Sequence, residues 1–375
     1  MRKRILFITG TRADYGKIKS LMKIVQEDPI FELFVFVTGM HLSRLHGSTY
    51  LEVQRDSWPN IQIDYASSNH DEGMAQKLAS IVSSLSNYIR EIQPDLTVVH
   101  GDRIEALSGA ISASLQNVRT AHIEGGEVTG TIDESIRHAI TKLSHEHLVA
   151  SDLAKERLLR LGEERARIHV IGSPDIDVMM SENLPSLSEV KRHYQIKFEE
   201  FFIAALHPVT TDLFSLKRQA EIFVDALVSS KRNGIVIYPN NDLGHEVILS
   251  EYDRLRNIPC FKIFPSVRFE YFLTLLKNCQ FIVGNSSAGI REAGIYGIPA
   301  IDIGTRQSGR YNLLDIKNIQ HVDFKLDSIL KAIDQTDAFR QHSMTFGDGR
   351  SASKFWGILT DPSFWERPIQ KKLTY

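Results

Sequence analysis

The sequence predicts an α/β protein of two domains, each built on a parallel β-sheet. Its 375 residues, of which 42% are hydrophobic, exceed what one ordinary core holds and suit two domains of this class. Short apolar runs alternate with longer amphipathic stretches from the start of the chain, which is typical of βα units and a parallel sheet. The alternation resumes after a stretch near the middle that contains Gly and Pro. Two such domains imply a cleft between them, where we expect the ligand.

The first half of the chain supplies the first βα series. Its apolar runs predict strands at 5–9, 31–37, 96–100, 119–123, 147–150 and 169–171. Helical periodicity predicts helices at 18–26, 74–91, 104–116, 135–143 and 152–161. This half is therefore expected to fold as one doubly wound sheet.

A hinge is predicted at Gly172-Ser173-Pro174 and the looser stretch 183–186, because Gly and Pro punctuate the chain there. A second series follows, with strands at 201–206, 234–238, 260–263, 281–283 and 300–303 and helices centred on Ala220, Glu246, Phe272 and Glu292. We therefore divide the chain into 1–172, 173–350 and 351–375. The last segment begins with an amphipathic stretch that we expect to pack back on the first domain.

Composition limits the partners and the compartment. The 44 Lys and Arg nearly balance the 46 Asp and Glu, so no excess of charge marks a nucleic-acid or membrane binder. Cys260 and Cys279 stand in apolar surroundings without zinc spacing, which suits a reducing compartment. The basic start of the chain precedes too short an apolar run for a signal peptide, and no later run approaches the roughly 20 residues of a membrane span. We expect a cytoplasmic protein.

The end of the first predicted strand is typical of an anion site. Gly10-Thr11-Arg12 leads directly into a helix that also carries Lys17, so backbone amides and two cations converge there. A tight turn with a solvated arginine is the alternative interpretation.

Acidic residues follow the next two strands. Gly101-Asp102-Arg103 ends one strand, Glu124 ends its neighbour, and Asp133 lies a short loop later. Asp102 is also a plausible N-cap for the helix that begins near residue 104. However, several carboxylates close to an anion site are costly unless chemistry uses them, so we interpret them as catalytic candidates.

The second half carries the strongest single motif. The strand at 281–283 ends in Gly284-Asn285-Ser286-Ser287-Ala288-Gly289 and opens a helix, so hydroxyls and amides suit a diphosphate. Glu292 lies within that helix, where a carboxylate can accept hydrogen bonds from a ribose diol. Arg306 adds a cation at the end of the next strand. An ordinary serine N-cap is the alternative interpretation.

Two further strand ends carry His207 and Asn240. A single histidine beside a strand is more often packed or solvated than catalytic, but His207 stands at an end expected to face the ligand. Its position makes it a candidate for the chemistry.

Several classes of chemistry lack their motifs. The chain has no G-x-G-x-x-G after its first strand and no P-loop, so neither a tightly held dinucleotide nor P-loop chemistry is indicated. His145-Glu146-His147 is not H-E-x-x-H, and Ser286 is not within a G-x-S-x-G elbow. We expect no metal and no cofactor.

Seven blocks along the chain match one known family. They are Gly-Thr-Arg-Ala-Asp-Tyr-Gly-Lys (10–17), His-Gly-Asp-Arg (100–103), His-Ile-Glu-Gly-Gly-Glu (122–127), Thr-Ile-Asp-Glu (131–134), His-Pro-Val-Thr (207–210), Tyr-Pro-Asn (238–240) and Gly-Asn-Ser-Ser-Ala-Gly-Ile-Arg-Glu (284–292). In order and spacing they resemble the hydrolysing UDP-N-acetylglucosamine 2-epimerases of sialic-acid synthesis. The resemblance covers nearly the whole chain. It implies two Rossmann-like domains in a GT-B-like arrangement, a homodimer or homotetramer, a UDP-sugar substrate, and no metal or nicotinamide.

The resemblance also implies roles for individual residues. The catalytic positions of the family fall on Asp102, Glu124, Asp133 and His207. Positions near the diphosphate and the nucleotide fall on Arg12, Lys17, Arg103, Ser286, Ser287, Arg306, Asn240 and Val267, and the ribose-binding acid falls on Glu292. Gly16 stands where some relatives have a serine that touches the phosphates.

The expected reaction converts UDP-N-acetylglucosamine and water to N-acetylmannosamine and UDP, by elimination to 2-acetamidoglucal and rehydration. Four alternatives remain open. They are the same reaction on UDP- or GDP-2,4-diacetamido-2,4,6-trideoxyglucose, as used for legionaminic acid, non-hydrolysing 2-epimerisation, a GT-B glycosyltransferase and a non-catalytic nucleotide sensor.

Overall fold

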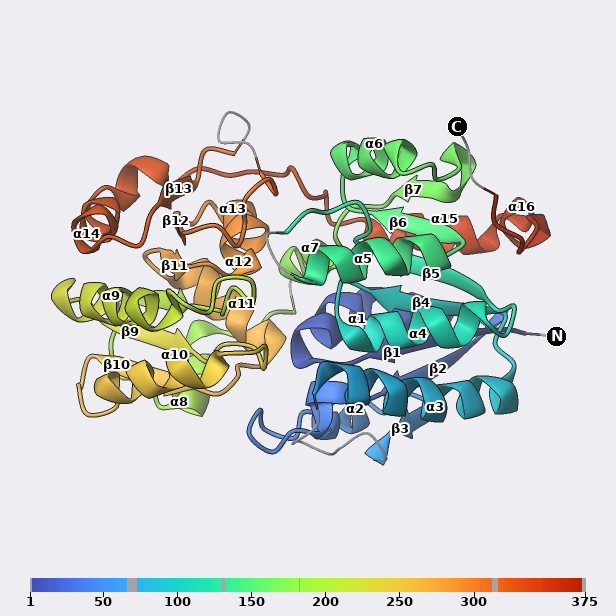
Figure 1. Cartoon of the computed structure of the whole chain (residues 1–375), viewed down its shortest axis with the longest axis horizontal. Helices are drawn as coiled ribbons and strands as arrows, with labels where there is room; N and C mark the ends of the chain where they lie inside the picture. Colours follow the sequence, from blue (N-terminus) through green and yellow to red (C-terminus); the bar gives the residue numbers. More distant parts are fainter. Residues whose placement is uncertain (1, 66–72, 130–131, 182, 312–315, 373–375) are drawn as a thin grey trace. The chain divides into compact units, whose positions relative to one another are not determined.

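The computed structural model describes residues 2–65, 73–129, 132–181, 183–311 and 316–372. The chain divides into two compact units, each shown with its elements in Figure 1. Unit 1 comprises Met1–Glu127, Asp133–Met180 and Phe346–Tyr375, and unit 2 comprises Val128–Ile132 and Ser181–Thr345. Each unit contains one parallel sheet with helices, so the predicted fold class of two parallel α/β domains is confirmed.

The sheet of unit 1 has the order β3-β2-β1-β4-β5-β6-β7, with every neighbouring pair parallel. Its strands are β1 (Lys3–Thr9), β2 (Phe31–Val37), β3 (Ile61–Ile63), β4 (Leu96–His100), β5 (Arg119–Ile123), β6 (Glu146–Val149) and β7 (Ile168–Val170). The order reverses between β1 and β4. In a doubly wound sheet, ligands bind at the carboxyl ends of the strands beside such a reversal.

Helices pack against both faces of this sheet. They are α1 (Arg12–Glu27), α2 (Tyr50–Arg55), α3 (Met74–Ile92), α4 (Ile104–Ser114), α5 (Ile132–Leu143), α6 (Asp152–Arg160), α7 (Pro174–Met179), α15 (Ser351–Thr360) and α16 (Pro362–Glu366). Ile5 and Phe7 of β1 join a core with α1, α15 and α16, whereas Leu6 and Ile8 join a core with α3, α4 and α5. A strand buried on both faces explains the continuous apolar run at the start of the chain.

Unit 2 repeats the same topology. Its order is β10-β9-β8-β11-β12-β13, again all parallel, with the reversal between β8 and β11. The strands are β8 (Phe202–Ala205), β9 (Gly234–Ile237), β10 (Phe261–Phe264), β11 (Ile282–Gly284), β12 (Ala300–Ile303) and β13 (Ile319–Val322). The helices are α8 (Leu187–Tyr194), α9 (Leu216–Ser229), α10 (His245–Tyr252), α11 (Phe269–Asn278), α12 (Ser287–Ile290), α13 (Glu292–Ile295) and α14 (Leu326–Asp334).

Two strands were not predicted, and one helix begins earlier than its periodicity indicates. β3 and β13 are edge strands of three and four residues that contain polar positions, so neither gives a distinct apolar run. α1 begins at Arg12 because Thr11 and Asp14 form a capping box. Capping chemistry, and not hydrophobic periodicity, fixes this helix start beside the first strand end.

The C-terminal segment belongs to unit 1, and its residues 373–375 lie outside the described part of the chain. The α15 N-terminus is held by Asp177 of α7, which accepts hydrogen bonds from the amides of Ser351 (2.8 Å) and Ala352 (2.6 Å). A carboxylate is stabilised at a helix N-terminus by the unpaired amides and the helix dipole. Unit 1 thus contains α7 as well as the returning helices α15 and α16.

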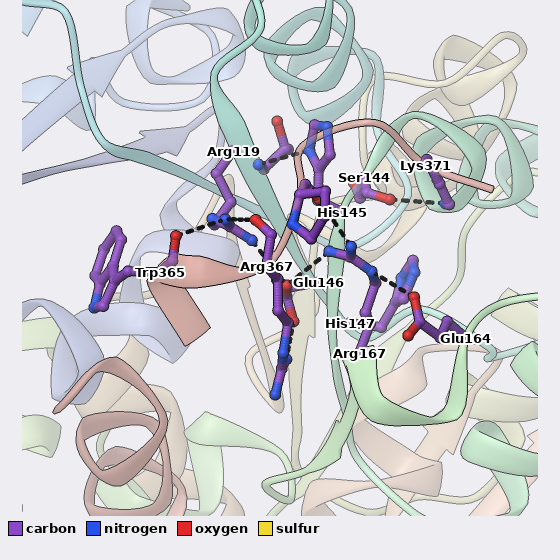
Figure 2. A network of polar contacts seen from close by, with 12 residues as sticks. Arg119, Ser144, His145, Glu146, His147, Glu164, Arg167, Trp365, Arg367 and Lys371 are labelled. Carbon is purple, nitrogen blue, oxygen red and sulfur yellow. Dashed lines mark hydrogen bonds and ion pairs between the residues drawn. The ribbon is translucent and has the colours of Figure 1, made fainter. Parts of the chain in front are cut away.

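A buried ionic network fastens the tail beyond α16 (Figure 2). Glu146, at the start of β6, is fully buried and pairs with Arg119 (3.1 Å), Arg167 (3.2 Å) and Arg367 (2.9 Å). Arg119 also donates to the carbonyls of Trp365 and Arg367. The network lies at the amino ends of β5 to β7, so it is remote in the sheet from the strand ends that carry the candidate site.

Candidate functional site

The strand end after β1 is organised by Asp14. Its carboxylate accepts hydrogen bonds from the amides of Gly10 (3.0 Å) and Thr11 (3.1 Å), while the Thr11 hydroxyl accepts the amide of Asp14 (3.1 Å). These bonds fix the turn between β1 and α1. Asp14 therefore serves the backbone of the predicted anion loop.

The two cations predicted here both pair with acids of unit 1. Arg12 donates through Nε to Glu52 Oε2 at 3.0 Å and makes a second contact with the same carboxylate. Lys17 Nζ lies 3.3 Å from Asp175 Oδ2, and both side chains are largely buried. Neither is the freely solvated side chain that the alternative interpretation of this turn requires.

β4 and β5 bring two of the expected carboxylates to neighbouring strand ends. The strands pair with His100 opposite Ile123, so Asp102 and Glu124 follow adjacent positions of the sheet. Glu124 lies 3.2 Å from His100 Nε2 through Oε1, and the same oxygen accepts a hydrogen bond from Ser173 Oγ at 3.0 Å. Glu124 is thus placed by residues that come from two other parts of unit 1.

Asp102 and Asp133 are linked through α5. Asp102 forms an ion pair with the buried Arg137, whose NH1 also donates to the Glu127 carbonyl at 3.0 Å. Asp133 precedes Arg137 by four residues on the same helix, and residues so spaced share a helix face. The structure therefore gathers the three expected carboxylates around β4, β5 and α5.

The alternative role of Asp102 as an N-cap is wrong. The N-cap of α4 is Arg103, with φ of −99° and no capping by its side chain. The Arg103 Nε lies 3.5 Å from Glu105 Oε2, within the first turn of that helix. Asp102 lies outside this cap and pairs with Arg137.

His122 of β5 supports this loop from beneath. Its Nε2 donates to the carbonyl of Gly101 at 2.8 Å, because a carbonyl accepts only. Burial lowers the pKa of His122 to about 3, so the imidazole is neutral near pH 7. Because His122 is neutral, it adds no charge to the loop that carries Asp102, where Asp102 and Arg137 form an ion pair.

In unit 2, His207 follows β8 and is held by two asparagines. The amide of Asn240 donates to His207 Nδ1 at 3.0 Å, so a neutral ring carries its proton on Nε2. The Asn285 side chain accepts from the His207 amide (2.7 Å) and donates to its carbonyl (2.9 Å). The Asn285 carbonyl in turn accepts bonds from Arg306 (3.2 Å) and Gln307 (2.8 Å).

The predicted helix after β11 is two short segments. Ser286 caps α12 through its hydroxyl, which accepts the Ala288 amide at 3.4 Å, but α12 is only four residues long. The chain breaks at Arg291, and Glu292 then begins α13 and is 2% exposed. A helix of four residues has only a weak dipole, because few peptide units are aligned in it. A diphosphate bound here would therefore depend on the serine hydroxyls, the local backbone amides and Arg306.

The expected residues divide between the units. Unit 1 holds Arg12, Lys17, Asp102, Arg103, Glu124 and Asp133. Unit 2 holds His207, Asn240, Val267, Ser286, Ser287, Glu292 and Arg306, all at or just beyond the carboxyl ends of the strands β8 to β12. Of the matching blocks, Thr131 lies outside the described residues.

Sequence reasoning missed four residues that hold the candidates: His100, Ser173, Arg137 and Asn285. His100 and Asn285 stand inside blocks that match the family, so they carried a signal. Ser173 and Arg137 carried none, because their partners are distant in the chain.

Comparison with known proteins identifies the family. The model of the UDP-N-acetylglucosamine 2-epimerase family matches residues 23–360. The chain belongs to the UDP-N-acetylglucosamine 2-epimerase family. Because the match covers most of both sheets, membership applies to the two units together.

Three curated relatives give the range of the family around this chain. A UDP-N-acetylglucosamine 2-epimerase of Neisseria meningitidis serogroup B is 47% identical over 99% of the chain and 98% of its own length. A UDP-N,N'-diacetylbacillosamine 2-epimerase (hydrolyzing) of Legionella pneumophila is 31% identical over 96% of both. The polysialic acid biosynthesis protein P7 of Escherichia coli is 32% identical over 82% of the chain and 80% of its own length.

A solved structure of the family shares the fold. The UDP-N-acetylglucosamine 2-epimerase of Methanocaldococcus jannaschii, in complex with UDP-N-acetylglucosamine and UDP, superposes with a TM-score of 0.79. It is 20% identical and is matched over 95% of this chain and 99% of its own.

Two further observations concern metal binding and membrane spans. Among the residues that the structure describes, no group of three or more His, Cys, Asp and Glu is arranged to hold a metal ion. Within the same ranges, no helix is both long and apolar enough to cross a bilayer.

Proposed function

We propose that this epimerase is a hydrolysing enzyme that converts UDP-N-acetylglucosamine and water to N-acetylmannosamine and UDP. The carboxylates gathered around β4, β5 and α5 carry the proposal, because inverting C2 without a redox cofactor requires a proton to leave and another to arrive. The 47% identical relative named for UDP-N-acetylglucosamine supports the substrate. The relative named hydrolyzing and the polysialic acid protein support the reaction type and a role in sialic-acid synthesis.

The nucleotide is assigned to the strand ends of unit 2. Ser286, Ser287 and Arg306 would bind the diphosphate, and Glu292 would accept hydrogen bonds from the ribose diol. Asn240 and Val267, at the ends of the neighbouring strands β9 and β10, would surround the rest of the nucleotide. We propose that Arg12, Lys17 and Arg103 of unit 1 also bind the diphosphate, with Arg12 and Lys17 exchanging their carboxylate partners for phosphate oxygens.

The first step is an elimination. As the bond from C1 to the UDP oxygen breaks, its electron pair leaves with UDP, and a carboxylate takes the C2 proton while the C1–C2 double bond forms. The cations and hydroxyls at the diphosphate stabilise the charge that develops on the leaving group. The intermediate is 2-acetamidoglucal.

The second step reverses the protonation on the other face of the ring. A second acid delivers a proton to C2 while water adds its oxygen to C1 and gives up a proton to a base. The product is N-acetylmannosamine. The need for two proton-transfer groups on different faces explains why one carboxylate is insufficient. Asp102, Glu124 and Asp133 are the candidates for these groups, with His207 as a further candidate.

The same reaction on a UDP-linked 2,4-diacetamido-2,4,6-trideoxy sugar is the second candidate. The 31% identical relative favours it by its name, although the higher identity of the N-acetylglucosamine relative favours the first. We further propose a cytoplasmic homodimer or homotetramer.

The deciding experiment is incubation with UDP-N-acetylglucosamine and observation by proton NMR. We expect free UDP and the resonances of N-acetylmannosamine, formed without added metal or nucleotide cofactor. Appearance of UDP-N-acetylmannosamine without UDP release would identify a non-hydrolysing enzyme. A parallel incubation with the 2,4-diacetamido sugar nucleotide distinguishes the two substrates.

Variants of the carboxylates complete this test. Asp102→Asn and Glu124→Gln are expected to lower turnover by at least about a hundredfold, the scale of a lost general acid or base, at preserved UDP binding. UDP binding is measured by calorimetry. Turnover close to that of the wild type in either variant would remove that residue from the mechanism.

A further inference from the structure

The loop that follows β10 carries Val267, one of the residues assigned to the nucleotide. Residues 265–268, which we call the base loop, connect β10 to α11 and have no regular secondary structure. Backbone amides and carbonyls in such a loop can pair with the polar edge of a planar base. They bind one base well only if the loop is already held in a single conformation before the ligand arrives.

The start of the base loop is fixed by the sheet. β10 pairs in parallel with β9, with Phe264 opposite Ile237, and the Tyr238 amide donates to the Phe264 carbonyl at 3.0 Å. Asn240, also assigned to the nucleotide, follows Tyr238 by two positions. The base loop and Asn240 therefore leave neighbouring strands at the same edge of the sheet, where a doubly wound fold binds its ligand.

The end of the base loop is fixed by a tyrosine from another helix. Tyr194 is the last residue of α8, and its hydroxyl oxygen accepts a hydrogen bond from the Arg268 amide at 3.0 Å. Arg268 is the N-cap of α11, and the first amides of a helix have no partner within the helix itself. Tyr194 supplies that partner, so it determines where the base loop joins α11.

The ring of Tyr194 is itself held by α11 and β10. Its centroid lies 4.9 Å from that of Phe264 and 5.9 Å from that of Tyr271, both in edge-to-face geometry. Just before α8 begins, the Pro185 carbonyl accepts a hydrogen bond from the buried Thr274 of α11 at 2.8 Å. These contacts fix the Tyr194 hydroxyl relative to the two elements that the base loop connects.

We propose that Tyr194 is a positioning residue that holds the base loop in the conformation that recognises uracil. The inference rests on the proposed function and concerns the choice of nucleotide, not the chemistry at C2. Uracil presents an N–H donor at N3 beside a carbonyl acceptor at C4, whereas cytosine presents an acceptor at N3 beside an amino donor at C4. Backbone groups fixed to match one pattern are left unpaired against the other, which is how a polar site discriminates between ligands of equal size.

The test compares the affinities for UDP and CDP, measured by calorimetry, of the wild type and of Tyr194→Phe, which removes the hydroxyl and keeps the ring. We expect the wild type to bind UDP more tightly, and the ratio of the two affinities to fall by at least about threefold in the variant, the scale of one hydrogen bond. KM for the UDP-sugar should rise with kcat within about twofold, because the reacting groups are unchanged. An unchanged ratio would overturn the inference even if both affinities fell, since general loosening of unit 2 weakens both nucleotides alike.

Tyr271→Phe is the matched control. The Tyr271 hydroxyl donates to Glu189 Oε1 of α8 at 3.4 Å, so this variant also removes a tyrosine hydroxyl that links α11 to α8. It retains the ring, which lies 5.6 Å from the Arg268 guanidinium. The ratio of UDP to CDP affinities should remain that of the wild type. A fall equal to that in Tyr194→Phe would assign the effect to the packing of α8 on α11 and contradict the inference.

The donor of the bond provides a second measurement, should Tyr194→Phe not fold. Arg268 has φ of −55°, which proline can adopt, so Arg268→Pro removes the amide donor. Arg268→Ala keeps the amide and accounts for the lost side chain. We expect the ratio of UDP to CDP affinities to be lower in Arg268→Pro than in Arg268→Ala by at least about threefold. Equal ratios in these two variants would contradict the inference.

Failure of the inference and failure of the proposed function give different results. If the wild type releases no UDP from UDP-N-acetylglucosamine, the proposed function fails. If it releases UDP but binds UDP and CDP equally well, or if Tyr194→Phe keeps the wild-type ratio, the inference alone fails.

Discussion

Three candidate side chains, those of Asp102, Glu124 and His207, lie beside partners that are themselves buried. Arg137 holds Asp102, and its permanent charge favours the ionised carboxylate. Asn285 holds His207 by two backbone bonds and leaves the ring Nε2 directed away from the Asn240 amide. Side chains held in this way keep their orientation when the substrate binds. Such fixed orientation is what efficient catalysis requires of its reacting groups.

Asn285 provides a test at this scale. Asn285→Ala removes both side-chain bonds to His207, so we expect kcat to fall by at least about tenfold, since a displaced catalytic group costs that much or more. Asn318→Ala is the control, because its buried amide also donates to a carbonyl, that of Ile298 at 3.0 Å, between the amino ends of β12 and β13. Both variants should lose about 1–3 kcal/mol of stability. Equal loss of kcat in both would contradict the positioning role of Asn285.

The loops that follow parallel strands place the candidates, and glycine determines how closely those strands approach. Gly284 ends β11 with φ of +135°, and a Cβ there would lie 2.0 Å from the Ala205 carbonyl oxygen of β8. The close approach allows the Asn285 amide to bond the same carbonyl at 3.1 Å. The close approach of the two backbones and the candidate residues His207 and Ser286 therefore lie at the same place, where the strand order reverses between β8 and β11.

Alanine substitutions at two glycines distinguish the need for close backbone approach at Gly284 from the ordinary effect of glycine in a helix, which Gly357 represents. Gly284→Ala should destabilise unit 2 by about 2 kcal/mol or more, because both its conformation and its space exclude a side chain. Gly357→Ala, on an exposed position of α15 with no atom within 4 Å of the added Cβ, should stabilise unit 1 by about 0.5–1 kcal/mol. Urea unfolding measures both. A neutral Gly284→Ala would refute the close-approach argument.

At the scale of the whole molecule, buried neutral histidines couple stability to pH. Burial lowers the pKa of His41 to about 4, of His122 to about 3 and of His145 to about 4, all in unit 1. Glu163 adds an acid: burial alone would raise its pKa, but hydrogen bonds from His147, Lys371 and Lys142 lower it to about 2. All four groups bind protons more readily when unfolded.

We therefore expect unit 1 to lose stability as the pH falls below about 6.5. The unfolded state takes up protons there while the folded state keeps these histidines neutral, which corresponds to about 2 kcal/mol for His41 between pH 6.5 and 5. Urea unfolding at a series of pH values measures the slope. His41→Gln should make the slope less steep, because His122 and His145 still contribute to it. A flat wild-type profile from pH 7 to 5 would refute the argument.

The sequence by itself determined most of the strands and the longer helices around them, the two-sheet fold class and the strand ends that carry the candidate residues. These follow from local periodicity, turn residues and spacing, which a chain reveals without folding. The short edge strands β3 and β13 were not predicted because polar residues interrupt their apolar runs.

Only the tertiary structure decided what holds each candidate. Asp102 meets Arg137 across 35 positions, Glu124 meets Ser173 across 49, and His207 meets Asn285 across 78. It also decided that the chain leaves unit 1 at Met180 and returns to it at Phe346. Contacts between residues so distant in the chain arise from sheet order and packing, about which hydrophobic periodicity carries no information.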